Sequence, residues 1–365
     1  MNILFTRFPL ESVHGGTEIQ TLSLMKGLVE KGHSVSFLGS CSVLLKQAPL
    51  RGVEVYPLHV GEPPVTKWGA VSFAWRQKKL KADLMTAMKK MKVPDAVCML
   101  SLSEKIVLTQ FAASHGSRVF WIEHDRVGRW LTMNPWFPSL KKAGAQATVI
   151  CVSELSRKLY VDLGFEASHV AAIPNGIDLQ RFADARRTAH AGSPLNVGCI
   201  ARLSPEKGIE HLIDAARMVP GIHVTIVGKG RERQVLADRI ETAGLTERVR
   251  ILDAVPDLGA FYASLDIFVL PSSDHDPFGL VAAEAISMGT ATVVTDLCGI
   301  AGYLDNGENC VIAKAGDSAS LAAAIRSLVT DDDRRLRIAA AGKTAAEKLF
   351  SVEKMVRMYE ELLHA

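Results

Sequence analysis

The stretch Ser264-Leu-Asp-Ile-Phe-Val-Leu-Pro-Ser-Ser-Asp-His-Asp-Pro-Phe-Gly-Leu-Val-Ala-Ala-Glu-Ala-Ile-Ser-Met-Gly-Thr290 contains a strand, a polar turn and a helix in succession. Its apolar run over 267–270 predicts a buried strand, and the residues from Phe278 onward are apolar on nearly every side, as in a buried helix. Asp276 is predicted to be the N-cap of that helix. Glu284 lies within the helix, where a buried carboxylate needs a cation or hydrogen-bond donors as partners.

Strands and helices alternate on both sides of this stretch, which predicts an α/β protein with parallel sheets between helices. Because 365 residues exceed what one hydrophobic core usually serves, two doubly wound domains are expected. We place the boundary in the polar, arginine-rich residues 184–194, between a domain over 1–185 and a domain over 195–350. The expected strands span 3–5, 34–38, 53–58, 96–100, 118–122, 148–153, 170–173, 195–201, 223–227, 249–252, 267–270, 291–295 and 311–313.

Composition excludes several classes of protein. The formal net charge of +3 is too small to indicate nucleic-acid binding. The six cysteines are scattered singly, mostly in apolar runs, which is typical of reduced core residues. The first residues enter a strand directly, and no apolar stretch is long enough for export or for spanning a membrane. A cytoplasmic protein is therefore expected.

A basic segment lies in the first half of the chain. Residues 75–91 have apolar side chains at helical spacing and carry an arginine and several lysines. One explanation is a surface helix with a solvated lysine face. The other is a basic surface over 75–92 that contacts the anionic inner face of a membrane or holds an anionic acceptor. The aromatic, proline-rich residues 130–138 are expected to form a loop that lines an acceptor cleft.

The first domain offers three candidate ligand-site residues. Gly15 and Gly16 open a helix, where glycines either let a ligand approach the first-turn amides or form a plain tight turn. Their spacing is not Gly-x-Gly-x-x-Gly, so no nicotinamide cofactor is implied. His124 follows the strand over 118–122, at the edge where doubly wound sheets hold functional groups, and is either structural or functional.

The second domain has the parts of an anion site. Arg202 and Lys207 bracket a turn between a strand and a helix, and such a pair of cations suits a diphosphate. The helix after Pro277 is expected to direct the amides of 278–280 toward the same crevice. The hydroxyls of a ribose would then explain Glu284, so a nucleotide diphosphate fits all three features.

These residues resemble the retaining GT-B glycosyltransferases of family 4. The signature of that family is an acidic residue, seven others and a glutamate around a Pro-Phe-Gly-Leu turn, here Asp276-Pro-Phe-Gly-Leu-Val-Ala-Ala-Glu284. Further matching segments, in matching order, are His14-Gly-Gly16, Glu123-His124, Val152-Ser-Glu154, Pro174-Asn-Gly-Ile-Asp178, Arg202 with Lys207, and Ile226-Val-Gly-Lys-Gly230.

The resemblance implies two Rossmann-like domains that face across a cleft, with residues 352–365 forming a helix that packs back on the first domain. The second domain would bind a nucleotide-sugar donor, with a UDP-sugar favoured over a GDP-sugar. The first would hold a sugar, glycolipid or other hydroxyl acceptor, in bacterial-type glycan, lipopolysaccharide or glycolipid synthesis. The acceptor would attack on the face from which the diphosphate departs, so the sugar keeps its anomeric configuration. No cofactor and no metal are expected.

The resemblance also implies roles for individual residues. Arg202 and Lys207 would neutralise the diphosphate leaving group and Glu284 would hold the ribose. His124 would touch the donor sugar near the reacting carbon, and Asp276 would contact that sugar, which completes the predicted catalytic set. The expected donor-binding residues are Gly15, Gly16, Gly228, Val255, Phe278, Gly279, Leu280 and again Glu284.

One residue departs from the family pattern. Asp276 stands where glutamate is more common, which shortens the reach by about 1.3 Å and leaves the donor sugar and the direct role of Asp276 open. Asp274 and Asp276 also form an Asp-x-Asp sequence, which is an alternative metal site. Two other functions are alternatives: an epimerase or phosphorylase on the same scaffold, and an inactive nucleotide-sugar-binding relative that acts as a regulator or scaffold.

Overall fold

The computed structural model describes residues 1–10, 15–182, 192 and 194–365, which form two compact units. The first unit comprises 1–176 and 352–365, and the second comprises 177–351. The division thus falls earlier than the predicted boundary at 184–194, most of which lies outside the described residues. The reason is local: Ile177 donates its N–H to the carbonyl of Phe350 at 2.6 Å and forms a β-bridge with Ser351, which joins it to the second unit.

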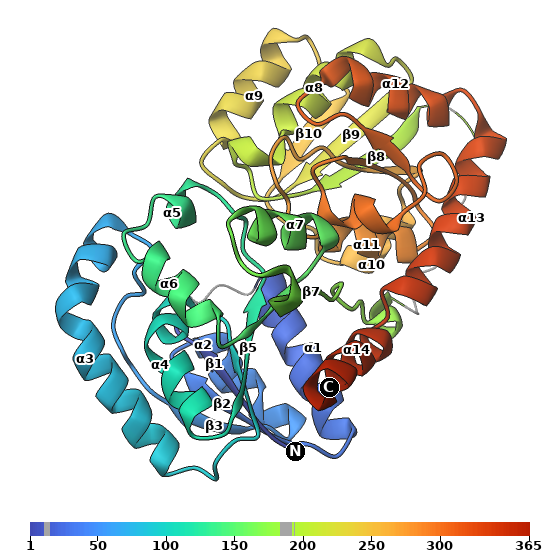
Figure 1. The fold of residues 1–365 in the computed structure, drawn as a ribbon. Coiled ribbons are helices and arrows are strands. Elements are labelled where there is room, and N and C mark those ends of the chain that lie inside the picture. Colours follow the sequence, from blue (N-terminus) through green and yellow to red (C-terminus); the bar gives the residue numbers. More distant parts are fainter. Residues whose placement is uncertain (11–14, 183–191, 193) are drawn as a thin grey trace. The chain divides into compact units, whose positions relative to one another are not determined.

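The first unit is built on a seven-stranded parallel sheet in the order β3-β2-β1-β4-β5-β6-β7 (Figure 1). Every strand expected in this part of the chain is present, with ends shifted by a few residues. The strands are β1 (Asn2–Arg7), β2 (Ser34–Gly39), β3 (Glu54–Pro57), β4 (Ala96–Met99), β5 (Arg118–Glu123), β6 (Thr148–Cys151) and β7 (Val170–Ala172).

Helices cover both faces of this sheet. One face is covered by α1 (Gly16–Glu30), α2 (Ser42–Gln47) and the C-terminal α14 (Val352–His364). The other is covered by α3 (Lys67–Lys89), α4 (Leu102–Ser114), α6 (Phe137–Gly144) and α7 (Glu154–Asp162). Short helices add α5 (Arg129–Thr132), η1 (Pro49–Arg51) and η2 (Ala167–His169).

Two predictions about the first unit are wrong. The basic helix α3 begins eight residues before Trp75, because the Thr66 hydroxyl accepts the Gly69 N–H at 2.9 Å and caps an earlier turn. The predicted loop over 130–138 instead contains the end of α5 and the start of α6. Pro138 lies in the first turn of α6, where its missing N–H costs no hydrogen bond.

The second unit is built on a six-stranded parallel sheet in the order β10-β9-β8-β11-β12-β13. Its strands also match the expected positions: β8 (Leu195–Ile200), β9 (Ile222–Val227), β10 (Val249–Leu252), β11 (Ile267–Leu270), β12 (Ala291–Thr295) and β13 (Val311–Ala313). The helices are α8 (Ile209–Met218), α9 (Arg233–Thr242), α10 (Leu258–Ala263), α11 (Leu280–Ser287), α12 (Ser318–Val329) and α13 (Asp332–Leu349), with η3 (Leu179–Phe182), η4 (Pro205–Lys207) and η5 (Gly299–Tyr303).

Each sheet has a topological switch point, where neighbouring strands lead to loops that run in opposite directions. It lies between β1 and β4 in the first unit and between β8 and β11 in the second. Ligands of doubly wound sheets bind beyond the carboxyl ends of the strands at such points. Lys207 and Asp276 lie in the segments that follow β8 and β11. The strand order therefore indicates that these residues lie at a ligand-binding edge of the sheet.

Two further predictions concern the cores and the membrane. All six cysteines are buried and free, as expected of reduced core residues. Burial raises the pKa of Cys98 and of Cys199 to about 12, which keeps these thiols protonated. In the described part of the chain, the helices are all too short or too polar to cross a bilayer.

Candidate active site

The turns after β8 and β11 meet at the switch point of the second unit. Gly208 has φ 61°, and a Cβ there would collide with the carbonyl oxygen of Pro271, so the close packing of the two turns needs glycine. The N–H of Ser273 donates to the carbonyl of Glu206 at 3.1 Å. This contact places Lys207, the last residue of η4, against the loop that follows β11.

Lys207 and Asp276 form a largely buried ion pair at this point. The Lys207 Nζ lies 2.6 Å from Asp276 Oδ2, with side-chain exposures of 19% and 8%. The buried hydroxyl of Ser272 donates to the same oxygen at 3.1 Å. Two predicted catalytic residues are therefore brought together, with the ammonium of Lys207 held by the Asp276 carboxylate.

The predicted N-cap role of Asp276 is wrong. Helix α11 begins at Leu280, and its N-cap is Gly279 with φ 94°. Asp276 instead anchors the loop before the helix: its N–H donates to the Leu297 carbonyl and its own carbonyl accepts the Gly299 N–H. The carboxylate is thus released to bind Lys207 rather than the first-turn amides, and Phe278 lies before the helix.

Glu284 has two partners that the sequence did not identify. Its Oε2 accepts the Tyr262 hydroxyl at 2.8 Å, and its Oε1 lies 3.1 Å from Arg181 Nη1. Burial raises the pKa of Glu284, while the Tyr262 hydrogen bond and the charge of Arg181 lower it. The expectation of a waiting cation or donor is confirmed, since both are present. Tyr262 and Arg181 are distant in sequence, and no spacing pattern links them to Glu284.

Arg202 is not part of the Lys207 pair. Its side chain is 72% exposed and lies 3.7 Å from Glu206, a separation typical of a loose surface ion pair. Its position two residues after β8 still places it at the carboxyl edge of the sheet. The structure therefore leaves Arg202 beside the site as an exposed cation.

Two predicted donor-binding residues lie at the same edge. Gly228 follows β9, and a Cβ there would collide with the Ala201 carbonyl, so the packing of two backbone segments already requires glycine. Val255 is half-buried, in a loop after β10 whose neighbouring residues are exposed. Both positions suit a ligand at the carboxyl edge, but Gly228 has a structural explanation as well.

In the first unit, the glycine turn is held by a carboxylate. Gly15 donates its N–H to Glu18 Oε2 at 3.3 Å, and Gly16 begins α1. The other oxygen, Glu18 Oε1, lies 2.6 Å from Arg7 Nη2 at the end of β1. His14 of the predicted glycine motif lies outside the described residues. The turn is therefore fixed to the first strand through Glu18 and Arg7, a pair that the sequence did not single out.

His124 lies just beyond β5 and is half-buried. Burial, followed by the positive charges of Arg7 and Lys105, lowers the pKa of His124 to about 3. Its neighbour Glu123 forms a buried ion pair with Lys105 at 2.7 Å. His124 is thus neutral near pH 7, so it can offer a hydrogen-bond donor and an acceptor but no charge.

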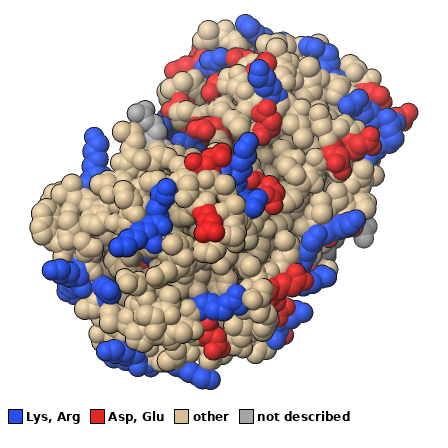
Figure 2. All heavy atoms as spheres, in the orientation of Figure 1, with Lys and Arg blue, Asp and Glu red and all other residues tan. Residues whose placement is uncertain are grey.

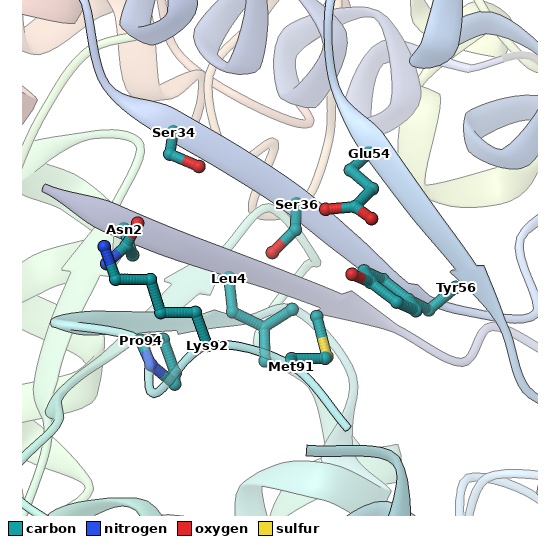
Figure 3. Close-up of a pocket in the computed structure, with 9 residues that line it drawn as sticks. All are labelled: Asn2, Leu4, Ser34, Ser36, Glu54, Tyr56, Met91, Lys92 and Pro94. Atoms are coloured by element: carbon teal, nitrogen blue, oxygen red, sulfur yellow. The ribbon is translucent and has the colours of Figure 1, made fainter. Parts of the chain in front are cut away.

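Across the described residues, no three His, Cys, Asp or Glu side chains are grouped as metal ligands. A small cavity lies at the amino ends of β1, β2 and β3, the opposite edge of the first sheet (Figure 3). It is lined by Asn2, Leu4, Ser34, Ser36, Glu54, Tyr56, Met91, Lys92 and Pro94. None of these is a predicted catalytic or donor-binding residue, although Met91 and Lys92 belong to the predicted basic surface over 75–92.

Two family models match the chain. The model of glycosyltransferase family 4 matches residues 14–181, and the model of glycosyl transferases group 1 matches residues 180–345. This chain belongs to the GT-B glycosyltransferases of family 4. The first match includes every strand of the first sheet except β1, and the second includes all six strands of the second sheet, so the family relation extends to both Rossmann-like units.

Curated relatives of this family-4 chain share part of its length. It is 34% identical over 228 residues to the phosphatidyl-myo-inositol mannosyltransferase of Mycobacterium leprae. This aligned region covers 58% of each of the two chains. It is also 34% identical over 164 residues to the lipopolysaccharide core biosynthesis glycosyltransferase LpsE of Rhizobium meliloti, covering 45% of this chain and 48% of the relative. The match thus spans about half the length of these relatives.

Solved structures show the same fold over the whole chain. Anabaena HepE in complex with UDP has a TM-score of 0.82 at 21% identity, with 100% of both chains covered. Sucrose-phosphate synthase from Thermosynechococcus elongatus has a TM-score of 0.80 at 20% identity, covering 100% of this chain and 98% of that one. The predicted GT-B fold class is confirmed.

Proposed function

We propose that this protein is a retaining glycosyltransferase that moves a sugar from a nucleotide diphosphate to an acceptor hydroxyl. The observation that supports this most is the Lys207–Asp276 pair at the switch point, together with Glu284 eight residues later on α11. The pair supplies a cation for a leaving group and a carboxylate for a sugar hydroxyl. Glu284 supplies an acceptor for ribose hydroxyls.

In this proposal the ion pair changes partners when the donor binds. Lys207 turns its ammonium toward the diphosphate and stabilises the charge that grows on it as the sugar departs. Asp276, released from Lys207, accepts a hydroxyl of the donor sugar, and Ser272 keeps its carboxylate in place. Arg202, exposed at the same edge, adds a second cation. The acceptor then attacks on the face that the diphosphate leaves and passes its proton to a diphosphate oxygen.

The donor is proposed to be a UDP-sugar. HepE, which shares the fold, was crystallised with UDP and with UDP-glucose. Lys207 and Arg202 would do the work of a divalent ion, so the proposed reaction needs no metal. The roles of Gly15, Gly16, His124, Gly228 and Val255 stay predictions.

A donor screen and a transfer assay test the proposal. Thermal shift with UDP-, GDP- and ADP-sugars identifies the donor, because bound ligand raises the apparent stability. Release of the nucleotide is then measured with and without sugar and glycolipid acceptors. Lys207→Ala is expected to lower kcat/KM about 100-fold or more, which is typical of removing one electrostatic stabiliser of a transition state. Lys343→Ala, at an exposed position on α13, is the matched control.

Other outcomes of the assay would support other functions. A protein that binds a nucleotide sugar but releases no nucleotide with any acceptor would be the inactive relative that regulates or scaffolds. Conversion of the sugar without an acceptor would indicate an epimerase, and formation of a sugar 1-phosphate from a glycan and inorganic phosphate would indicate a phosphorylase. Any of these three results would overturn the transferase proposal.

We further propose that α3 contacts an anionic membrane and so presents the enzyme to a lipid-linked acceptor. Trp68, Val71 and Trp75 follow one another at helical spacing and are 70%, 52% and 72% exposed. Exposed lysines lie before them and continue along the helix to its C-terminal end: Lys67, Lys78, Lys79, Lys81, Lys89 and Lys90. Basic side chains predominate along the side of the molecule where α3 lies (Figure 2). Tryptophan and lysine together are typical of helices that lie in a membrane interface.

Vesicle sedimentation with and without phosphatidylglycerol tests this surface. Binding is expected only with the anionic lipid, and salt should weaken it because the attraction is screened. Trp68→Ala with Trp75→Ala should reduce binding, while Leu336→Ala, which truncates an exposed apolar side chain on α13, should not. Binding that is equal with and without the anionic lipid would contradict the proposal. Binding that is unchanged when both tryptophans are replaced would also contradict it.

A further inference from the structure

The carboxylate of Glu284 is held at both oxygens by groups of very different solvent exposure. Tyr262 donates to Oε2 from a side chain with no exposed surface, whereas Arg181 contacts Oε1 from a side chain that is 40% exposed. Glu284 itself is 14% exposed. One oxygen is therefore fixed from the protein interior, and the other is held from the solvent side.

The Tyr262 ring is rigidly packed. It contacts Phe182, Phe268 and Phe261 with ring centroids 5.6, 5.8 and 6.2 Å away. It belongs to the short helix α10, which is capped by the Asp257 carboxylate: this accepts the Ala260 N–H at 3.1 Å. A phenol held in this way can direct its hydroxyl only where the packing points it, which is toward Glu284.

Arg181 reaches Glu284 from η3, and its guanidinium lies 5.1 Å from the ring of Phe182. Phe182 packs in turn against Tyr262. The cation and the phenol are thus supported by one aromatic cluster and act on the two oxygens of one carboxylate. A carboxylate has about four acceptor positions, so two remain for hydroxyl groups of a ligand.

We propose that Tyr262 and Arg181 are positioning residues that hold Glu284 ionised and oriented to accept the ribose hydroxyls of the nucleotide. The inference rests on the proposed function, since it needs a nucleotide donor. Tyr262 fixes the plane of the carboxylate, and Arg181 supplies a positive charge at its other oxygen. Neither residue needs to touch the nucleotide.

Binding of UDP and of its 2′,3′-dideoxy analogue, measured by calorimetry, tests the inference. Tyr262→Phe removes only the hydroxyl and keeps the packed ring. We expect it to weaken UDP binding about tenfold, the factor for one hydrogen bond to a charged group. The dideoxy analogue, which lacks the ribose hydroxyls, should bind wild type and Tyr262→Phe with similar affinity. Tyr359→Phe removes a buried phenol hydroxyl in the first unit and is the matched control.

The pH profile of UDP binding separates positioning from a structural effect. In the described residues, Tyr262 and Arg181 are the groups whose hydrogen bond and charge act on Glu284. Because both favour the ionised form, Tyr262→Phe and Arg181→Gln should each move the loss of binding on acidification to higher pH. The titration of UDP itself is common to all variants and cancels in the comparison. Glu284→Gln should bind weakly without this shift.

The outcomes distinguish the inference from the proposed function. If wild type binds no nucleotide diphosphate, the proposed function fails and the inference fails with it. Suppose that wild type binds UDP and that Glu284→Gln weakens UDP binding. If Tyr262→Phe and Arg181→Gln then bind UDP as tightly as wild type does, only the inference is overturned. Equal losses for UDP and the dideoxy analogue would also overturn it, because they would indicate a general structural role. Arg181→Gln alters an exposed side chain, so it remains informative if Tyr262→Phe does not fold.

Discussion

Glu104 is a fully buried carboxyl group near the switch point of the first sheet. Its Oε1 accepts the Ser101 N–H at 2.7 Å and its Oε2 accepts the Ser103 hydroxyl at 3.0 Å. These hydrogen bonds and the charge of Lys105 favour ionisation, but burial outweighs them and raises the pKa of Glu104 from 4.5 to about 7. The group thus titrates near neutral pH inside a folded unit.

A raised pKa makes Glu104 a pH-dependent element of stability. The folded state holds its proton more tightly than the unfolded state, so the contribution is complete below about pH 4.5 and is lost as pH rises through about 7. The loss amounts to about 3 kcal/mol at 1.36 kcal/mol per pKa unit. Glu104→Gln keeps the accepting oxygen but cannot ionise, so its unfolding free energy should fall less than that of wild type between pH 4.5 and 8.

Urea denaturation at both pH values measures this difference. Glu361→Gln, at an exposed position on α14 in the same unit, is the control and should behave as wild type does. If Glu104→Gln and wild type lose stability in parallel, Glu104 is already ionised in the fold and the pKa argument is wrong.

At the scale of elements, α14 closes the core of the first unit. Its buried residues Met355, Val356, Tyr359 and Leu363 join the cluster formed by α1 and the sheet. The two helices approach closely because α1 has a glycine at the contact: a Cβ at Gly27 would collide with the Val356 side chain. Figure 1 shows α1 and α14 side by side.

This contact predicts a change of sign in a double-mutant cycle. In wild type, Gly27→Ala should destabilise the first unit by about 1–3 kcal/mol, because overpacking outweighs the gain in helix propensity of about 1 kcal/mol. In a Val356→Ala background the obstructing methyl groups are gone, so the same substitution should be neutral or stabilising. Urea denaturation of the four proteins gives the coupling energy. An equal cost in both backgrounds would show that the α1–α14 contact does not limit residue 27.

At the scale of the whole molecule, the chain forms two units with separate cores, one of which holds the candidate donor-site residues Lys207, Asp276 and Glu284. We expect calorimetry to show two unfolding transitions. UDP should stabilise the transition of the second unit by about 2.7 kcal/mol at 100 times its Kd, with a smaller effect on the first.

Two variants assign the transitions in that experiment. Gly27→Ala should lower the transition of the first unit alone, and Glu284→Gln should reduce the shift that UDP causes in the other, because it binds UDP more weakly. A UDP-dependent shift confined to the transition that Gly27→Ala lowers would contradict the assignment of the donor site to the second unit.

Much of the fold follows from local sequence. Buried parallel strands are continuous apolar runs, and such runs can be located without knowing what covers them, which is why every expected strand is present in the structure. The predicted starts of the helices are less accurate. The caps that decide them, Thr66 for α3 and Gly279 for α11, compete with nearby residues of equal or better capping propensity, such as Asp276.

The candidate site, too, is predicted in part by the sequence and in part shown only by the tertiary structure. The sequence by itself determined the family, the paired residues Asp276 and Glu284, and the need of Glu284 for a partner, because these depend on residue type and spacing within one stretch. Only the tertiary structure decided the partners: Lys207 lies 69 residues from Asp276, and Arg181 lies 103 residues from Glu284. Such contacts depend on strand order and on the close approach of turns, and neither leaves a periodic pattern in the sequence.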